Sequence, residues 1–296
     1  MADGGFDSDG RSYNNAHDLW VEEIGGSEEE KRVWYNKGIS YWQSVEASMD
    51  GVLGGFGHLN ETDVKGSEDF LKTLLASRGM NGPGQHLVAL DCGSGVGRVT
   101  KNLLLRYFNE VDLVEPVKHL LEAAHGSLAS ENNMIEDVHK AVNFYCLPLQ
   151  EFTPEVGRYD VIWIQWCIGQ LTDDDFIAFF ERAKAGLKPH GFFFLKENFA
   201  KAGFVYDKED HSITRSIQYF KDLFEKCGLH VIDIECQEDF PGELFAVKMF
   251  ALEPEETKRT TESMVEKQSI KHVTDKRKRF SGGRKKKQSN MPAVIN

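Results

Sequence analysis

The chain has 296 residues, 41% of them hydrophobic, and a formal net charge of −12 at pH 7. One α/β core with unfolded ends fits this length, because domains typically comprise about 100 to 200 residues. No segment approaches the roughly 18 uninterrupted apolar residues of a membrane span, and the first residues, MADGGFDSDG, lack the basic and apolar parts of a secretion signal. These features exclude a membrane-spanning protein and predict a soluble, intracellular chain with no membrane partner.

The negative charge is concentrated in the body of the chain. From Lys267 to the end, ten Lys or Arg residues stand against one acidic residue, Asp275, which gives a local charge of +9. Subtracting this from the total leaves about −21 on residues 1–266. A body of this sign repels phosphates and attracts cations. We therefore expect a basic peptide as the partner rather than nucleic acid, which only the tail could contact, and nonspecifically.

The five cysteines predict free thiols. They lie far apart, each within an apolar run, and they form no CxxC pair and no cluster with histidine at the spacing of metal ligands. Buried thiols of a reducing compartment, and no metal site, are expected at Cys92, Cys146, Cys167, Cys227 and Cys236.

Both ends of the chain are predicted to be disordered. Residues 1–26 form an acidic, glycine-rich segment without hydrophobic periodicity, and residues 253–296 form a basic tail that is nearly free of aromatic residues. Neither segment offers the apolar side chains that would offset the entropy lost on folding.

A helical extension is predicted over residues 27–80. Ser27 and Glu30 have the spacing of a capping box, which opens a helix with an aromatic side. Glycines in the following segment, MDGVLGGFGHLN, break this helix because they permit tight backbone turns. A second helix is expected to begin at Ser67 and to end at Gly79.

Residues 81–252 alternate between apolar strands and helices. Such strands predict a parallel sheet that is covered on both faces. The last two strands are joined by a turn that contains Pro241 and Gly242 and is too short for a crossover helix, so they must pair antiparallel. The prediction is an α/β fold with the seven-stranded, Rossmann-like sheet of class I methyltransferases and a terminal antiparallel hairpin. Strands are expected at 87–92, 111–115, 142–147, 160–165, 191–197, 229–236 and 244–252, and helices near 97–109, 117–126, 173–187 and 213–227.

The strongest motif is LDCGSGVGR, residues 90–98, between the first strand and the next helix. Its glycines let the backbone approach a ligand at the carboxyl end of a strand, where open α/β sheets bind ligands. Arg98 stands where the dinucleotide fingerprint requires a small residue, which disfavours NAD. Glu115 ends the second strand and is placed to accept hydrogen bonds from both hydroxyls of a ribose, a feature shared by adenosylmethionine and NAD.

Three segments together resemble the protein N-terminal methyltransferases that modify Xaa-Pro-Lys or Xaa-Pro-Arg ends, in particular plant members. They are DGVLGGFGHL (50–59), LDCGSGVGRVTKNLLL (90–105) and LQEFTPEVGRYDVIWIQWCIGQLTD (149–173), and the similarity spans about 30–252. The resemblance implies a methyltransferase domain over 81–252 that uses S-adenosylmethionine to methylate the free α-amino group left after removal of the initiator methionine. It also implies cofactor contacts at Gly93, Arg98, Glu115, Leu149, Gln150 and Gln165.

The resemblance also implies how the substrate is held. Asn198 would hydrogen-bond the first carbonyl of the substrate, Trp166 would pack on its proline, and Asp207, Asp210 and Ser212 would hold the third, basic residue. Chemistry supports these roles, because two carboxylates in one loop can flank a cation and an indole face suits a proline ring. Asp210 is the leading candidate to orient or deprotonate the amine, with Asn198 as a second catalytic residue.

Four further positions refine this hypothesis. Tyr41 and Trp42 would form part of a lid over both ligands, with the glycine-rich segment behind them as its hinge. Gln170 stands where relatives carry histidine, and it can hydrogen-bond the amine but cannot accept its proton at neutral pH. Phe245 replaces a pocket tyrosine and lacks its hydroxyl. Asp210 or water must then act as the base.

The tail and the activity leave alternatives open. The clusters KRKR (276–279) and RKKK (284–287) resemble a two-part nuclear import signal, which predicts nuclear and cytoplasmic residence. They could equally contact nucleic acid nonspecifically or have no function. A methyltransferase for a small amine or another nitrogen, and an inactive adaptor that binds adenosylmethionine, both remain possible. The sequence does not determine the substrate proteins, the number of methyl groups or self-association.

Overall fold

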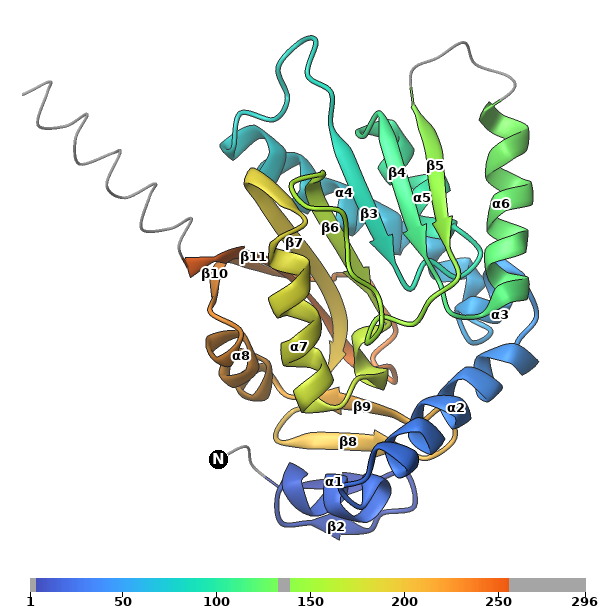
Figure 1. Cartoon of the computed structure of the whole chain (residues 1–296), viewed down its shortest axis with the longest axis vertical. Helices are drawn as coiled ribbons and strands as arrows, with labels where there is room; N and C mark the ends of the chain where they lie inside the picture. The colour runs from blue at the N-terminus through green and yellow to red at the C-terminus, as the bar shows by residue number, and fades with distance from the viewer. Residues whose placement is uncertain (1–3, 133–138, 256–296) are drawn as a thin grey trace, which may run out of the picture. The chain divides into compact units, whose positions relative to one another are not determined.

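The computed structural model describes residues 4–132 and 139–255 (Figure 1). Within these ranges, no helix combines the length and apolar character that crossing a membrane requires. The predictions for the tail from residue 256 onward lie outside the described residues. The expected start of the tail at 253 was too early, because Glu253 and Pro254 still belong to the last strand.

The predicted seven-stranded sheet is confirmed, with the strand order β10-β11-β7-β6-β3-β4-β5. Five strands are parallel, and β11 pairs antiparallel with both β7 and β10, as the short final turn required. The strands are β3 (Val88–Cys92), β4 (Glu110–Val114), β5 (Lys140–Tyr145), β6 (Tyr159–Gln165), β7 (Leu187–Phe199), β10 (Leu229–Cys236) and β11 (Ala246–Pro254).

Alternate residues of the central strands enter two different cores. Along β6, Val161 and Trp163 pack with one set of helices, whereas Ile162 and Ile164 pack with the other set. The first set is α4 (Asn60–Ser77), α5 (Arg98–Asn102) and α6 (Lys118–Asn132), and the second is α7 (Asp173–Lys184) and α8 (Ile217–Lys226) (Figure 1). Both faces are therefore covered, which explains the uninterrupted apolar runs in the sequence.

Three helix predictions were wrong in extent. The helix expected near 213–227 begins only at Ile217, because Ser212–Arg215 form a strand that pairs with Phe204–Asp207. The helix expected from Ser67 begins at Asn60, directly after a short 3₁₀ turn, η1 (Gly57–Leu59), and no side chain caps it, so the sequence carries no start signal. The helix expected over 97–109 is the short α5 followed by a 3₁₀ turn, η2 (Leu104–Arg106), because the backbone leaves the helical region at Leu103.

The capping box at Ser27 is confirmed. Its hydroxyl accepts the backbone N–H of Glu30 and donates to that carboxylate at 2.7 Å, and it opens α2 (Glu28–Ser44). A short helix, α3 (Met49–Val52), then leads into the glycine-rich segment. The thiols of Cys146 and Cys236 are exposed, contrary to the prediction that all five would be buried.

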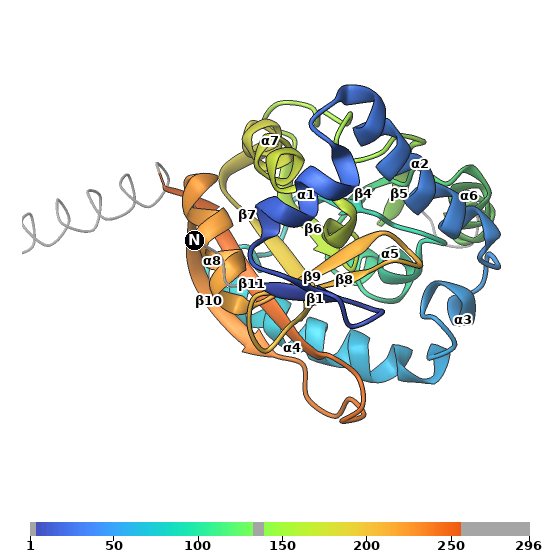
Figure 2. The same cartoon turned by 90° about the horizontal axis from the view of Figure 1, so that it is seen from below.

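The prediction of disorder over residues 1–26 is wrong for the described part of this segment. It forms β1 (Gly5–Asp7), β2 (Ser12–Tyr13) and α1 (Ala16–Ile24), which begins at an Asn15 cap. The strand β1 pairs parallel with β8 (Phe204–Asp207), which forms a hairpin with β9 (Ser212–Arg215). Figure 2 shows these elements together with α2 on one side of the main sheet. The pairing partner lies about 200 residues along the chain, so local periodicity could not reveal it.

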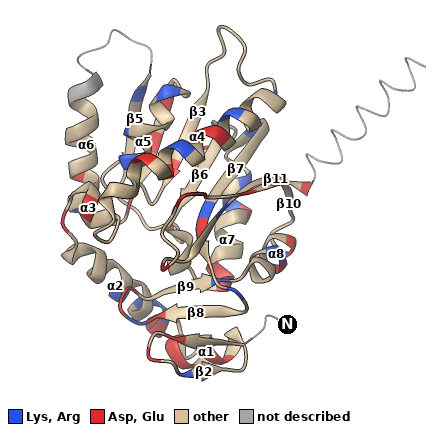
Figure 3. Cartoon of the chain, turned by 180° about the vertical axis from the view of Figure 1, so that it is seen from behind, with Lys and Arg blue, Asp and Glu red and all other residues tan. Residues whose placement is uncertain are grey.

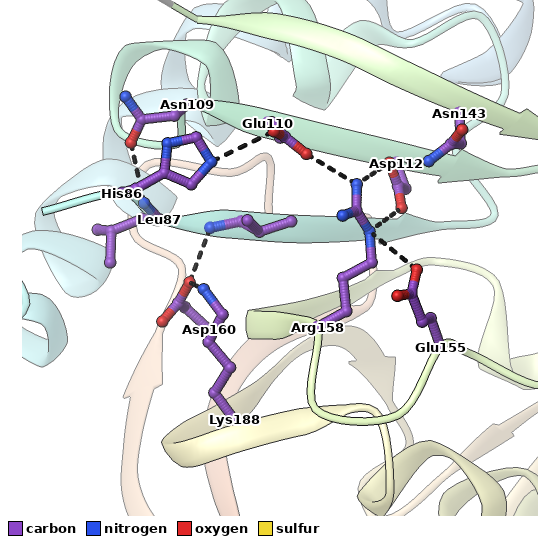
Figure 4. A network of polar contacts seen from close by, with 11 residues as sticks. His86, Leu87, Asn109, Glu110, Asp112, Asn143, Glu155, Arg158, Asp160 and Lys188 are labelled. Carbon is purple, nitrogen blue, oxygen red and sulfur yellow. Dashed lines mark hydrogen bonds and ion pairs between the residues drawn. The ribbon is translucent and has the colours of Figure 1, made fainter.

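The amino ends of the strands are closed by a network of charges (Figure 4). Asp112, fully buried on β4, accepts hydrogen bonds from the side chains of Arg158 (2.8 Å), Tyr159 (2.9 Å) and Asn143 (3.0 Å). Asp160 pairs with Lys188 at 2.6 Å and accepts the backbone N–H of Val88. These groups satisfy one another, so this edge of the sheet stabilises the fold and leaves the opposite edge to bind ligands.

Candidate active site

The glycine-rich loop has the tight geometry that its sequence predicts. Gly93, Gly95 and Gly97 all have positive φ angles, between 54° and 73°. A Cβ at Gly93 would lie 2.3 Å from the Cβ of Cys167, so no larger residue fits there. The backbone N–H of Ser94 donates to the carbonyl of Val114 on β4, which ties the loop to the neighbouring strand.

Glu115 is held rigidly beside this loop. Its Oε2 accepts the backbone N–H of Gly95 and its Oε1 accepts that of Val117, both at 2.9 Å. Burial raises the pKa of Glu115, and these two backbone donors act in the opposite direction. The carboxylate is thereby fixed at the end of β4, facing a cavity.

This cavity, which we call the cofactor cavity, collects every residue predicted to contact the cofactor. Gly93, Arg98, Glu115, Leu149, Gln150 and Gln165 all line it, although they come from four separate segments of the chain. Two of its lining residues that the sequence analysis overlooked lie in the motif itself. Asp91 accepts a hydrogen bond from Thr100 at 2.6 Å, and burial raises its pKa to about 6. The buried hydroxyl of Ser94 has no partner among the described residues.

Beneath the cofactor cavity, a buried ion cluster surrounds Asp63 of α4. Its carboxylate contacts Nη1 of Arg98 and Nζ of Lys196, each at 2.6 Å, and accepts from the side-chain amide of Gln165. Burial alone would raise the pKa of Asp63, but the two cations more than offset this and lower it. Burial lowers the pKa of Lys196 to about 8, although the negative charge of Asp63 acts to raise it. Asp63 thus positions two predicted cofactor contacts, and nothing in its local sequence indicated this.

A second cavity, the substrate cavity, adjoins the first. Among the predicted residues, Trp42, Trp166, Gln170, Asn198, Asp210, Ser212 and Phe245 line it. The two cavities share Trp42, Val52, Leu53, Trp166 and Gln170 as a common wall. Ligands in the two cavities would therefore lie next to one another, in contact with the same residues.

Trp166 occupies the centre of this wall in a strained conformation. Its φ of 51° is unusual for a tryptophan and follows directly after β6. The guanidinium of Arg98 and the ammonium of Lys196 lie 5.6 and 5.9 Å from the ring centre. Its buried indole N–H has no partner among the described residues, so it is free for a ligand.

Asp210 and Asp207 differ in their surroundings. Asp210 lies in the substrate cavity and accepts the backbone N–H of Ser212 at 3.0 Å, and burial raises its pKa to about 6. Asp207 is exposed, binds the backbone N–H of Glu209 and does not line this cavity. Figure 3 shows acidic positions along α1 and next to β8 and β9. Asp207 therefore lies at the end of β8, outside the substrate cavity.

The predicted lid is anchored at its start. The indole of Trp34 donates to the carbonyl of Gln170 at 2.9 Å, and Lys31 pairs with Asp175 of α7 at 2.7 Å. Trp42 follows on the same helix and reaches both cavities, whereas Tyr41 packs edge-on against Trp42 and lines a separate surface hollow. Of the predicted aromatic pair, the structure brings only Trp42 into the site.

A parallel sheet with a terminal antiparallel hairpin, a glycine loop after β3 and a buried carboxylate after β4 that faces the same cavity define a SAM-dependent methyltransferase. The residues present fit that cofactor. The glycine loop lets a ligand approach the backbone closely, and Glu115 faces the cavity. The buried hydroxyl of Ser94, which has no partner among the described residues, can hydrogen-bond a ligand there. The cofactor is S-adenosylmethionine.

Comparisons with known proteins identify the family. A family model described as AdoMet dependent proline di-methyltransferase matches residues 30–253. Alpha N-terminal protein methyltransferase 1 from Arabidopsis thaliana is 63% identical over 251 residues, 84% of this chain and 90% of the relative. N-terminal Xaa-Pro-Lys N-methyltransferase 1-A from Xenopus laevis is 41% identical over 224 residues, 76% of this chain and 97% of the relative.

A solved structure agrees with these relatives. A SAM-dependent methyltransferase from Leishmania major has a TM-score of 0.75 and 38% sequence identity, and the match covers 86% of this chain and 97% of that one. The chain belongs to the family of AdoMet-dependent proline di-methyltransferases.

Proposed function

We propose that this enzyme methylates the free α-amino group of proteins whose processed N-terminus reads Xaa-Pro-Lys or Xaa-Pro-Arg. The observation that carries this proposal is the wall shared by the two cavities, formed in part by Trp42, Trp166 and Gln170. It lets a peptide end in the substrate cavity reach a methyl donor in the cofactor cavity. The names of the relatives from Arabidopsis and Xenopus support the same substrate class.

Residues of the substrate cavity suit such a peptide end. The ring of Trp166 can pack against the proline, and the side chain of Asn198 can hydrogen-bond the first carbonyl. Asp210 and Ser212 supply acceptors deep in the cavity, and Asp207 adds negative charge at the exposed end of the hairpin for the basic third residue. An acidic site of this kind favours cationic peptides over neutral ones.

The amine must lose a proton before it can react. When bound, adenosylmethionine supplies an electrophilic methyl group on a sulfonium sulfur. An α-amine has a pKa of about 7.7 to 8.0 in water. Asp210, whose pKa is raised by burial to about 6, is ionised at neutral pH and able to hold and orient the ammonium group. Gln170 orients the amine through hydrogen bonds and leaves proton transfer to carboxylates or water.

The test is mass spectrometry of a short peptide with a free Ser-Pro-Lys end, incubated with the enzyme and adenosylmethionine. We expect mass gains of one or more methyl groups on this peptide and none on its N-acetylated counterpart. Asp210→Asn should lose turnover and retain cofactor binding. If the enzyme methylates small amines but no Xaa-Pro-Lys or Xaa-Pro-Arg peptide, the proposal is wrong and the enzyme is a small-amine methyltransferase. If it methylates no substrate, it is an inactive adaptor that binds adenosylmethionine.

The residence of the enzyme in both nucleus and cytoplasm is also a proposal. Its support is the pair of basic clusters at 276–279 and 284–287. A tagged chain that ends at residue 266 should lose nuclear accumulation, and an unchanged distribution would rule the signal out.

A further inference from the structure

A second carboxylate, which the proposed function has not used, lies in the substrate cavity. Glu197 is on β7, directly before Asn198, and lines the cavity together with Asp210. The residue is only 7% exposed. Its Oε1 accepts the backbone N–H of Asn198 at 2.9 Å, but its buried Oε2 has no hydrogen-bond partner among the described residues.

The cations near Glu197 have most of their donors bound to other groups. Nη2 of Arg215 on β9 binds Asp173 and the carbonyl of Leu171 at 2.9 and 2.7 Å, whereas its buried Nη1 has no hydrogen-bond partner among the described residues. Lys196, the preceding residue, pairs with Asp63 in the buried ion cluster. Lys248, opposite Glu197 on β11, has its ammonium 2.8 Å from the sulfur of Cys236.

The other charged groups that face Glu197 do not neutralise it either. Asp210 from the β8–β9 turn raises its pKa further, whereas Arg215 and the backbone N–H groups of Asn198 and Ile168 lower it. Asp63, which also lines the cavity, is already balanced by Arg98 and Lys196. An unpaired buried carboxylate is costly to keep. Proteins retain such groups mainly where they act on a ligand.

We propose that Glu197 is a further catalytic residue that accepts the proton of the substrate's α-ammonium group, and this role rests on the proposed function. The N–H bond breaks, and the proton forms a carboxylic acid on Glu197. The freed lone pair of the nitrogen forms a bond to the methyl carbon, and the electrons of the carbon–sulfur bond return to sulfur. Glu197 releases its proton to water in the cavity before the next methyl transfer.

The acidity of Glu197 suits this task. Burial raises its pKa to about 8, close to that of an α-amine, which is about 7.7 to 8.0. Proton transfer between groups of similar pKa is nearly balanced in free energy, which is favourable for general base catalysis. An arriving ammonium group favours the ionised form of Glu197, because opposite charges stabilise each other. This second carboxylate provides the proton acceptor that Gln170 cannot provide.

The test compares Glu197→Gln and Glu197→Asp with the wild type on the Ser-Pro-Lys peptide, with kcat and KM measured from pH 6 to 9.5. The matched control is Glu235→Gln, at an exposed position on β10. We expect Glu197→Gln to lower kcat by about 100-fold, the scale of general base catalysis, and to move the rise of the rate to higher pH. Glu197→Asp should restore part of kcat, and the cofactor affinity of both variants, measured by calorimetry, should match that of the wild type.

The possible results distinguish the role of Glu197 from the proposed function. Wild-type kcat and an unchanged pH profile in Glu197→Gln would overturn the role of Glu197 and leave the proposed function intact. If the wild-type enzyme itself leaves the peptide unmethylated, the proposed function fails and this role fails with it. If Glu197→Gln does not fold, as judged by cofactor binding, Glu197→Asp carries the test: wild-type kcat and pH profile there would overturn the role, and reduced kcat with a shifted profile would support it.

Discussion

At the scale of single residues, the cost of burying Glu197 should be measurable without any substrate. Burial raises the pKa of Glu197 from its ordinary value of 4.5 to about 8 in the folded protein. Between these two values the folded state binds more protons than the unfolded state, so its stability falls as pH rises from 4.5 toward 8.

We therefore predict that Glu197→Gln stabilises the protein at pH 8 by a few kcal/mol, since one pKa unit corresponds to about 1.4 kcal/mol, and has little effect below pH 4.5. Urea unfolding of both proteins at pH 4 and pH 8 checks this. Equal effects at the two pH values would mean that the carboxyl group is not strained by its burial. If Glu197→Gln gains stability and loses kcat, the carboxylate of Glu197 serves activity at a cost in stability.

Asp63 should behave in the opposite way. Asp63→Asn leaves Arg98 and Lys196 buried with one countercharge fewer. Breaking a buried ion pair of this kind costs about 3 to 5 kcal/mol, and Arg98 loses its fixed position in the cofactor cavity. We predict a lower unfolding free energy together with weaker cofactor binding, measured by denaturant unfolding and calorimetry. Asp69→Asn, at an exposed position on the same helix, should change neither quantity.

The residues that sequence reasoning found and missed differ in how local their signals are. All predicted cofactor contacts line one cavity because a glycine loop and a strand end are placed by the sheet itself. Asp63 and Glu197 were missed, because a carboxylate becomes noteworthy only when distant segments bury it. Asp207 and Tyr41 were predicted in the substrate site, but their side chains lie outside the substrate cavity. Their roles in substrate binding stay predictions.

At the scale of elements, the N-terminal segment supports the hairpin that carries Asp210. Besides the pairing of β1 with β8, the backbone N–H of Ser8 donates to the carbonyl of Tyr206 at 2.8 Å. Trp34 of α2 packs on the ring of Tyr206. The substrate-binding turn therefore belongs to a four-stranded sheet rather than to an isolated hairpin, which would be marginally stable by itself.

A single substitution should weaken this support. A Cβ at Gly5 would lie 2.5 Å from the carbonyl oxygen of Phe204, so Gly5→Val separates β1 from β8. We predict a rise in KM for the peptide with an unchanged cofactor affinity, because the residues predicted to contact the cofactor lie on other elements. Steady-state kinetics and calorimetry measure the two effects. Gly126→Ala, where an added Cβ meets nothing within 4 Å, is the matched control, and equal KM values for the two variants would contradict the prediction.

Element predictions succeeded for the strands of the main sheet and for the cap at Ser27, whereas the cap at Asn15 was missed. The strands of the main sheet were placed within a few residues, and Ser27 was identified as a cap. The predictions missed β1, β2, β8 and β9, which are two to four residues long. Strands this short are defined by their pairing partners and not by their own composition.

At the scale of the whole molecule, the two edges of the main sheet have separate tasks. The network at the amino ends holds Asp112 fully buried through Arg158 and Tyr159. Arg158→Met should cost about 3 to 5 kcal/mol of stability, because it leaves an uncompensated buried charge, while kcat and both KM values at 25 °C stay near those of the wild type. Denaturant unfolding and kinetics test this, and a large loss of kcat in folded protein would show that the edges are coupled.

The overall topology could be predicted from the sequence because few arrangements connect alternating strands and helices without left-handed crossovers. The antiparallel pairing of the last two strands followed from the length of the segment that joins them, because this segment is too short for a crossover helix. What could not be predicted is the second, smaller sheet, which joins residues near the N-terminus to residues 204–215.

The wall shared by the two cavities has a consequence for binding order and affinity. A ligand on one side that fixes Trp42 and Trp166 reduces the conformational entropy that the other ligand must remove. The two ligands are then thermodynamically linked, and reciprocity requires each to raise the affinity of the other by the same factor. The methyl donor and the peptide would then bind cooperatively, because either ligand would order Trp42 and Trp166 for the other.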